Sequence, residues 1–119
     1  MEIQALWAAL FNDEQGRPRS SGVILLRQGH VHGGDSNYHY QGSYGIEDGR
    51  LHLTLTATHF HGGRSHVVGD RDAFTLHLSG RTGGDFLVLA GELDDDPGVR
   101  VGVEMQRVAT LPEVGPATV

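Results

Sequence analysis

Residues 51–58, with the sequence Leu-His-Leu-Thr-Leu-Thr-Ala-Thr, decide the fold class, because apolar and polar residues alternate strictly along them. Successive side chains of a β-strand point to opposite faces of a sheet. The alternation therefore predicts a strand with one face in a core and the other in water. The same period of two recurs at 74–79 and at 99–106. Several such runs separated by glycine-rich turns predict an antiparallel sheet that closes into a barrel or folds into a sandwich.

The whole chain divides into eight short predicted strands. They cover residues 4–12, 23–26, 30–32, 38–44, 50–60, 73–81, 86–93 and 99–108. Asp48 and Gly49 are predicted to form a hairpin turn of the Asp-Gly kind, and Gly42 inside a strand indicates a bulge or a close backbone contact. This order favours an all-β fold, a single small antiparallel up-and-down barrel of the lipocalin or calycin type, with a sandwich as the alternative.

The length of 119 residues is enough for one domain with one core. We assign residues 1–108 to the barrel domain. Residues 109–119 are predicted to form a flexible tail, because two prolines and a glycine interrupt any regular period there.

The composition excludes several classes of function. The net charge is −6, the chain has no lysine, and its nine arginines are scattered, so direct binding of nucleic acid is not expected. The absence of cysteine excludes disulfides, thiolate catalysis and cysteine-based zinc sites. The apolar stretch at 5–11 is too short to span a membrane and lacks the basic residues that begin a signal peptide. We therefore expect a cytoplasmic protein that does not enter a membrane.

Eight histidines make a metal site worth considering. His30 with His32, and His59 with His61, place two imidazoles on one strand face, and His66 could supply a third ligand. A closed site needs three or four convergent ligands, and exposed strand positions also tolerate histidine as a polar residue. No serine has the sequence context of a catalytic nucleophile. We predict a protein without enzymatic activity, metal or cofactor, and keep a histidine-dependent metalloenzyme as the third alternative.

Three segments together resemble the GrlR-like family of small negative regulators of type III secretion. The first is the aromatic-led opening strand at 6–11. The second is a Gly-Gly-Asp turn followed by a tyrosine-rich strand, in which the family motif comprises Gly33, Gly34, Asp35, Tyr38, Tyr40 and Gly42. The third runs from 48–51 into the long strand and continues at 68–70 and 73–76. The resemblance covers roughly residues 5 to 108.

This resemblance implies an eight-stranded, lipocalin-like barrel that forms homodimers, has an apolar interior and acts without catalysis. The named member sequesters a transcriptional activator through an acidic cluster on the turn before the long strand. In this chain the corresponding partner-binding residues are Glu47 and Asp48, and the acidic run ends there because Gly49 and Arg50 follow.

Two functional hypotheses follow. The first is a non-catalytic regulatory module that acts as a homodimer through protein–protein interaction, with a partner such as a transcriptional regulator. The alternative is a barrel that carries or senses a small apolar ligand, although side chains can equally fill so small a barrel. The predicted cavity wall consists of Trp7, Leu53, Leu55, Phe74, Leu76, Val101 and Val103.

The histidines also predict a response to pH. Adding eight positive charges to −6 gives +2, and unperturbed histidine titrates near about pH 6.5. We expect solubility or self-association to change between neutral and mildly acidic pH, measured by sedimentation velocity. Identical sedimentation across this window would show that the histidines are incidental.

Overall fold

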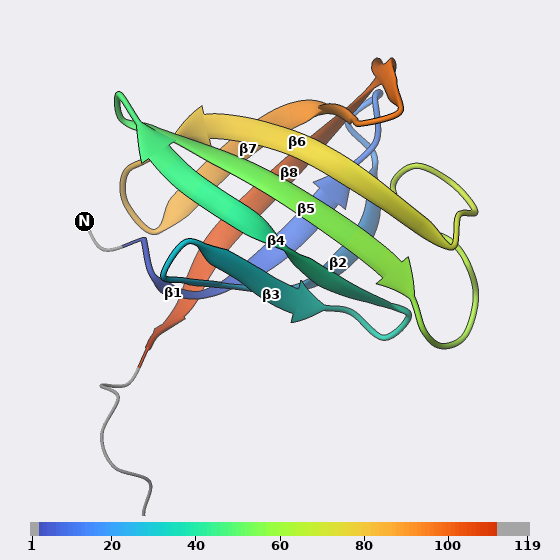
Figure 1. The fold of residues 1–119 in the computed structure, drawn as a ribbon, viewed down its shortest axis with the longest axis horizontal. Helices are drawn as coiled ribbons and strands as arrows, with labels where there is room; N and C mark the ends of the chain where they lie inside the picture. Colours follow the sequence, from blue (N-terminus) through green and yellow to red (C-terminus); the bar gives the residue numbers. More distant parts are fainter. Residues whose placement is uncertain (1–2, 112–119) are drawn as a thin grey trace, which may run out of the picture.

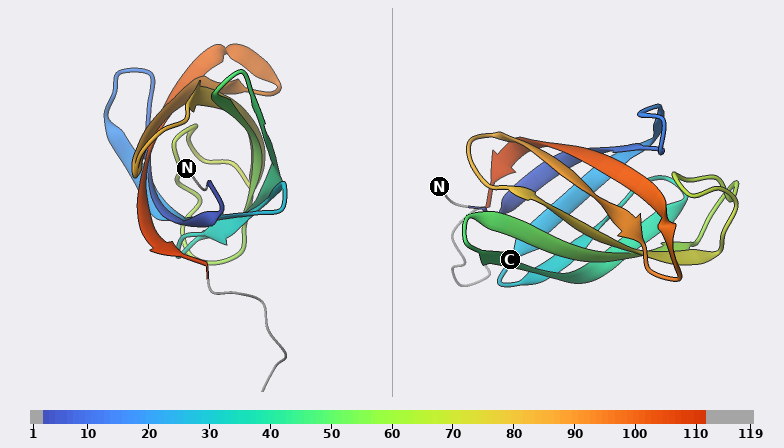
Figure 2. Two further views of the ribbon diagram at one scale, coloured as in Figure 1. Left: turned by 90° about the vertical axis from the view of Figure 1, so that its left-hand side faces the viewer. Right: turned by 90° about the horizontal axis from the view of Figure 1, so that it is seen from above.

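The computed structural model describes residues 3–111 and confirms the predicted fold class: an all-β, closed antiparallel barrel of eight strands. Each strand pairs with its neighbours in sequence, and β8 pairs with β1 to close the ring (Figures 1 and 2). No helix in residues 3–111 is long and apolar enough to cross a membrane. The strands are β1 (Ala5–Asn12), β2 (Pro18–Arg27), β3 (His30–Gly34), β4 (Tyr38–Glu47), β5 (Arg50–His59), β6 (Ala73–Arg81), β7 (Phe86–Leu93) and β8 (Asp96–Thr110).

Several strands are longer than their apolar runs predicted. β2 begins at Pro18, so the predicted loop at 13–21 shrinks to 13–17, and its first half consists of polar residues paired with β1. β3 extends to Gly34 and β4 to Glu47. The backbone N–H and C=O groups of a segment can form hydrogen bonds with a neighbouring strand whatever its side chains are. Polar residues next to an apolar run therefore extend the strand. β8 also extends to Thr110, inside the predicted tail 109–119, while residues 112–119 lie outside the described part.

The up-and-down order places successive connections at alternate ends of the barrel. We call the end with the β2–β3, β4–β5 and β6–β7 turns the N-terminal end, and the opposite end the capped end. In Figure 2 the connection formed by residues 60–72 crosses the mouth of the ring at the capped end. At the N-terminal end the Arg107 guanidinium carbon lies 4.7 Å from the centre of the Trp7 ring, and Arg107 pairs with Asp85 at 2.9 Å.

Alternating side chains fill the interior, as the period of two predicted. In β1 the even positions are partly exposed, whereas Ala5, Trp7, Ala9 and Phe11 are buried. The same alternation in β5 buries Leu51, Leu53, Leu55 and Ala57. These residues belong to one continuous core cluster that includes all eight strands. The barrel interior is therefore a packed core along both of these strands.

Close strand approach explains Gly42. A Cβ atom at this position would lie 1.8 Å from the carbonyl oxygen of Thr54 on β5. The β4–β5 register continues through Gly42 without a shift, so of the two predicted roles the close contact is correct and the bulge is wrong. The Asp-Gly turn is confirmed, because Asp48 and Gly49 have φ values of 52° and 74° between the paired residues Glu47 and Arg50.

We predict that Gly42→Ala lowers the free energy of unfolding by about 1–3 kcal/mol, because the added methyl group collides with backbone that cannot rotate away. Gly45→Ala in the same strand is the matched control, since nothing lies within 4 Å of its Cβ position. Urea unfolding of both variants checks this. Equal stability of the two variants would contradict the close contact.

Candidate functional site

The predicted partner-binding residues lie at the tip of the β4–β5 hairpin, at the N-terminal end of the barrel. Glu47 and Asp48 are both exposed. Arg50 follows the turn directly and has Arg81 of β6 as its cross-strand partner. Two acidic and two basic residues therefore lie close together along the backbone at this end of the barrel, so the hairpin region carries balanced rather than strongly negative charge.

The seven residues predicted to line a cavity all face the barrel interior and are buried. Phe74 is the most exposed of them, at 5%. All seven belong to the continuous core cluster, and none of them lines a groove on the outer surface described below. They are Trp7, Leu53, Leu55, Phe74, Leu76, Val101 and Val103.

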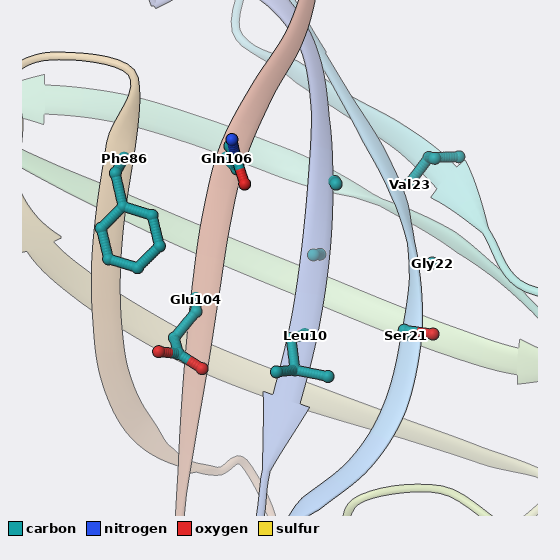
Figure 3. A pocket seen from close by; sticks show the side chains of 9 residues that line it. Leu10, Ser21, Gly22, Val23, Phe86, Glu104 and Gln106 are labelled. Carbon is teal, nitrogen blue, oxygen red and sulfur yellow. The ribbon is translucent and has the colours of Figure 1, made fainter.

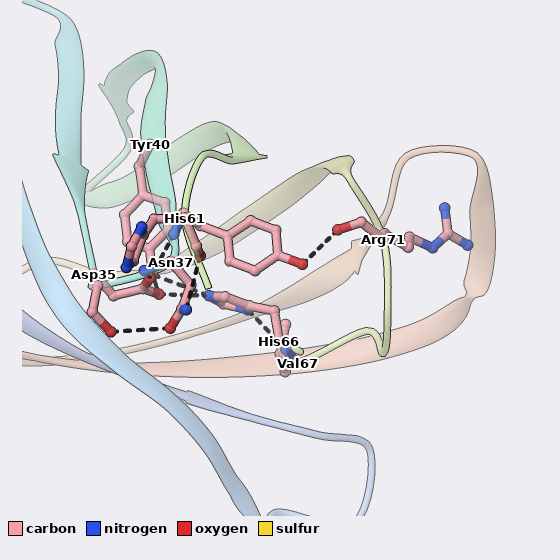
Figure 4. A network of polar contacts seen from close by, with 9 residues as sticks. Asp35, Asn37, Tyr40, His61, His66, Val67 and Arg71 are labelled. Atoms are coloured by element: carbon pink, nitrogen blue, oxygen red, sulfur yellow. Dashed lines mark hydrogen bonds and ion pairs between the residues drawn. The ribbon is translucent and has the colours of Figure 1, made fainter. Parts of the chain in front are cut away.

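Asp35 and Tyr40, two of the six residues of the motif described above, belong at the capped end to a buried polar network that the sequence did not reveal. Asp35 begins the β3–β4 connection as the predicted turn residue: its Oδ1 accepts hydrogen bonds from the backbone N–H groups of Asn37 (2.8 Å) and Tyr38 (2.7 Å). Its second oxygen, Oδ2, accepts the hydroxyl of Tyr40 at 2.6 Å (Figure 4). The carboxylate therefore links the turn to the interior of the barrel.

His66 completes this arrangement, which we call the His66 network (Asp35, Tyr40 and His66). The imidazole side chain is fully buried, and its Nε2 lies 3.0 Å from the Tyr40 hydroxyl and 3.4 Å from Asp35 Oδ2 (Figure 4). The backbone N–H of Val67 donates to Nδ1 at 2.7 Å. Nδ1 accepts this hydrogen bond, so the proton of the neutral ring is on Nε2. The Nε2–H group then donates toward the Tyr40 hydroxyl oxygen and toward Asp35.

The network shifts the acid–base behaviour of all three members. Burial lowers the pKa of His66 below its usual range, and the Asp35 carboxylate opposes this only in part. Burial tends to raise the pKa of Asp35. Its hydrogen bonds from Tyr40, Asn37 and Tyr38 outweigh that effect, so the pKa ends below the ordinary value. Burial and the neighbouring carboxylate raise the pKa of the Tyr40 hydroxyl. At neutral pH the network consists of a neutral imidazole, a neutral phenol and a carboxylate.

The histidine pairs considered as metal ligands have no third ligand beside them among residues 3–111. His30 and His32 are exposed, with ring centres 6.2 Å apart. His59 Nε2 contacts the carbonyl oxygen of Gly62 at 2.8 Å, and His66 uses both ring nitrogens within the protein. Among residues 3–111 no three histidine, aspartate or glutamate side chains come close enough together to hold a metal ion.

A second feature is an apolar groove on the outer surface of β7, β8, β1 and β2, with a volume of about 470 Å³ (Figure 3). We call it the outer groove. Phe86 stands at one side and Val23 at the other, with exposed fractions of 54% and 43%. Its lining is Ala8, Ala9, Leu10, Ser21, Gly22, Val23, Phe86, Glu104 and Gln106.

The outer groove was missed, although the sequence carries a signal for it. The stretches 5–11, 23–26 and 86–90 are apolar without alternation, so both faces of those strands are apolar. Only one face can lie in the core of a barrel, and the other must remain on the surface. Leu10, Val23 and Phe86 are such outward residues. A break in the alternation thus marks apolar surface.

Stability should fall on mild acidification because of His66. Since its pKa is lowered in the folded protein, the unfolded chain binds the proton first, and folding stability is lost as pH falls below about 6.5. We expect a loss of up to about 1.4 kcal/mol for each pH unit until the folded-state pKa is passed. Chemical unfolding between neutral and mildly acidic pH measures it.

His66→Gln removes the titrating group and should flatten this profile, whereas His52→Gln, at an exposed position of β5, should leave it unchanged. The groups that face His66 are Asp35, Tyr38 and Tyr40, and of these Asp35 titrates only well below this window. A wild-type profile that stays flat would contradict a buried neutral His66.

Sequence comparison with known proteins gives no relative of this chain. No model of a known protein family matches the chain, and no curated protein is significantly similar to it in sequence.

Proposed function

We propose that this chain is a non-catalytic regulatory module that acts through protein–protein interaction as a homodimer, with the outer groove at the centre of its self-association. The resemblance to GrlR-like regulators, with their lipocalin-like barrel, motivates the proposal. The observation that carries it is the apolar surface around the outer groove, because exposed apolar surface of this kind marks an interaction site.

The strand register arranges this surface in two outward rows. One row runs through Phe86, Gln106, Ala8 and Val23 on β7, β8, β1 and β2. The adjacent row runs through Val88, Glu104, Leu10 and Ser21. Phe86 and Val88 are more than half exposed. Large apolar side chains therefore project from β7 at one edge of the face, whereas the middle strands β8 and β1 carry Gln106, Glu104, Ala8 and Leu10.

Two properties of the face favour a second copy of the chain as its occupant. A two-fold dimer needs a self-complementary patch, and here the projecting Phe86 and the shallow region around Ala8 and Gly22 share one surface. Of the residues that line the groove only Glu104 is charged, and its Oε2 accepts a hydrogen bond from Asn12 at 3.3 Å. On a chain of net charge −6, two copies meet with the least repulsion on such a face.

The acidic hairpin supplies the proposed contact for a second protein. At the N-terminal end of the barrel, Glu47 is the last residue of β4 and Asp48 lies in the turn that leads to β5. The outer groove is built on β7, β8, β1 and β2, so self-association there leaves the hairpin accessible. The proposed partner is a transcriptional regulator that presents basic side chains to Glu47 and Asp48.

The carrier alternative receives less support. The seven residues that would line its cavity are part of the packed core, with exposed fractions of 5% or less. The buried His66 network makes its hydrogen bonds within the protein, which favours a structural over a catalytic role for it. Regulation by protein contact needs neither a cavity nor a reactive group.

We predict that Val88→Asp converts the dimer to a monomer, because each copy would then bury an unpaired carboxylate in the apolar interface. Val108→Asp is a closely matched control, since Val108 and Val88 are both 58% exposed, and Val88 belongs to an outward row of the face whereas Val108 belongs to neither row. Sedimentation equilibrium of the three proteins checks this. A monomeric wild type, or equal dissociation by both variants, would contradict the proposed interface.

Native mass spectrometry of the untagged protein from its own cells tests the regulatory role. A dimer that carries a second protein, and that loses it when Glu47 and Asp48 are replaced by Gln and Asn, supports the proposal. A co-purified small apolar molecule would instead support the carrier.

A further inference from the structure

The His66 imidazole is enclosed by four aromatic rings. Its ring centre lies 4.9 Å from that of Phe11, 5.1 Å from those of Tyr38 and Phe74, and 5.9 Å from that of Tyr40. The rings of Phe11, Tyr38 and Tyr40 are close to perpendicular to the imidazole, at 71° to 84°. We call these four residues the aromatic cage.

The cage and its occupant come from different parts of the fold. Strands β1, β4 and β6 supply the four rings, whereas His66 lies in the connection between β5 and β6. Within that connection residues 61–65 are exposed, and His66 and Val67 are buried. The strands therefore form a pocket, and the connection inserts one side chain into it across the capped end.

The pocket also contains a fixed negative charge. Asp35 Oδ2 lies 3.4 Å from His66 Nε2, and its hydrogen bonds lower the pKa of the carboxyl group, so that it is ionised at neutral pH. A cation is attracted to the face of an aromatic ring when it lies within about 6 Å of the ring centre. A positive charge at the position of the imidazole would lie within this distance of all four ring centres and beside a carboxylate.

We propose that the capped end of the barrel is a binding site for a small organic cation of the quaternary ammonium or imidazolium class, which His66 occupies as an intramolecular plug. This site lies inside the barrel at the capped end and does not depend on the proposed dimer. The plug is neutral, because Val67 N–H donates to Nδ1. It fills the cage without using the attraction that the rings and Asp35 offer to a full positive charge.

The attachment of the connection is compatible with such an exchange. His66 is held by the Val67 N–H contact, by its turn with Gly69 and by the His66 network. Two other hydrogen bonds anchor the ends of the connection. At its start Asn37 Nδ2 donates to the carbonyl oxygen of His61 at 2.9 Å, and at its end the Tyr38 hydroxyl donates to the carbonyl oxygen of Arg71 at 2.5 Å. Withdrawal of the middle of the connection would remove His66 from the cage and Val67 from the core while these two end contacts stay in place.

His66→Ala opens the cage and gives a direct test, with tetramethylammonium as the probe. We expect this variant to bind tetramethylammonium about tenfold more tightly than tert-butanol, a neutral molecule of similar shape, in isothermal titration calorimetry against sodium chloride of equal ionic strength. His66→Leu refills the cage with an apolar side chain and should bind neither probe. Adding Asp35→Asn to His66→Ala should remove the preference for the cation while leaving tert-butanol binding in place.

Absence of tetramethylammonium binding by a folded His66→Ala variant, or equal affinity for both probes, would overturn the proposal. Should His66→Ala be unfolded alone, circular dichroism with each probe decides the matter. Refolding by tetramethylammonium but not by tert-butanol would support a cation site, and failure to refold with either would reject it. Because these variants leave the outer groove intact, their outcome is separate from that of the dimer experiment.

Discussion

The hydrogen-bonded ladder between β1 and β8 is the constraint on which the rest of the structure depends. Without it the eight strands would form an open sheet whose two faces are equivalent in kind. Closure makes one face an interior of limited volume and the other a surface. A register shift between Leu6 and Trp7 in this ladder places Arg107 opposite Trp7. The inward positions of β8 then continue from Met105 to Arg107, which packs on the Trp7 ring at the N-terminal end.

The limited interior also accounts for the two ends. Aliphatic side chains fill the middle, but each mouth must be covered by groups that can face both the core and water. At one end an arginine covers a tryptophan and pairs with Asp85. At the other a connecting segment inserts His66 among four aromatic rings and satisfies its two ring nitrogens. In the described residues no buried side-chain nitrogen or oxygen lacks a hydrogen-bond partner.

The sequence predicted the local features well and the long-range ones poorly. Alternation at 51–58 identified β5, and the Asp48–Gly49 turn was correct because both depend on a few adjacent residues. The start of β2 at Pro18 was missed, since polar residues there are held in the sheet by β1. The His66 network could not be predicted, because its members come from separate segments that only the closed barrel brings together. Asp35 was correctly read as a turn residue, yet its second oxygen has a partner 31 positions away in His66.

The strands that are apolar on both faces have a consequence for the chain before it folds. Residues 5–11 and 86–90 contain no charge, proline or glycine, and are rich in large apolar and β-branched or aromatic residues. Segments of this kind are prone to aggregate as intermolecular β-structure when they are exposed. The closed barrel protects them by pairing both edges of each strand, and an unfolded or newly synthesised chain lacks that protection. The solubility of this protein during synthesis therefore depends on how quickly β1 finds β8, the most distant pairing in the sequence.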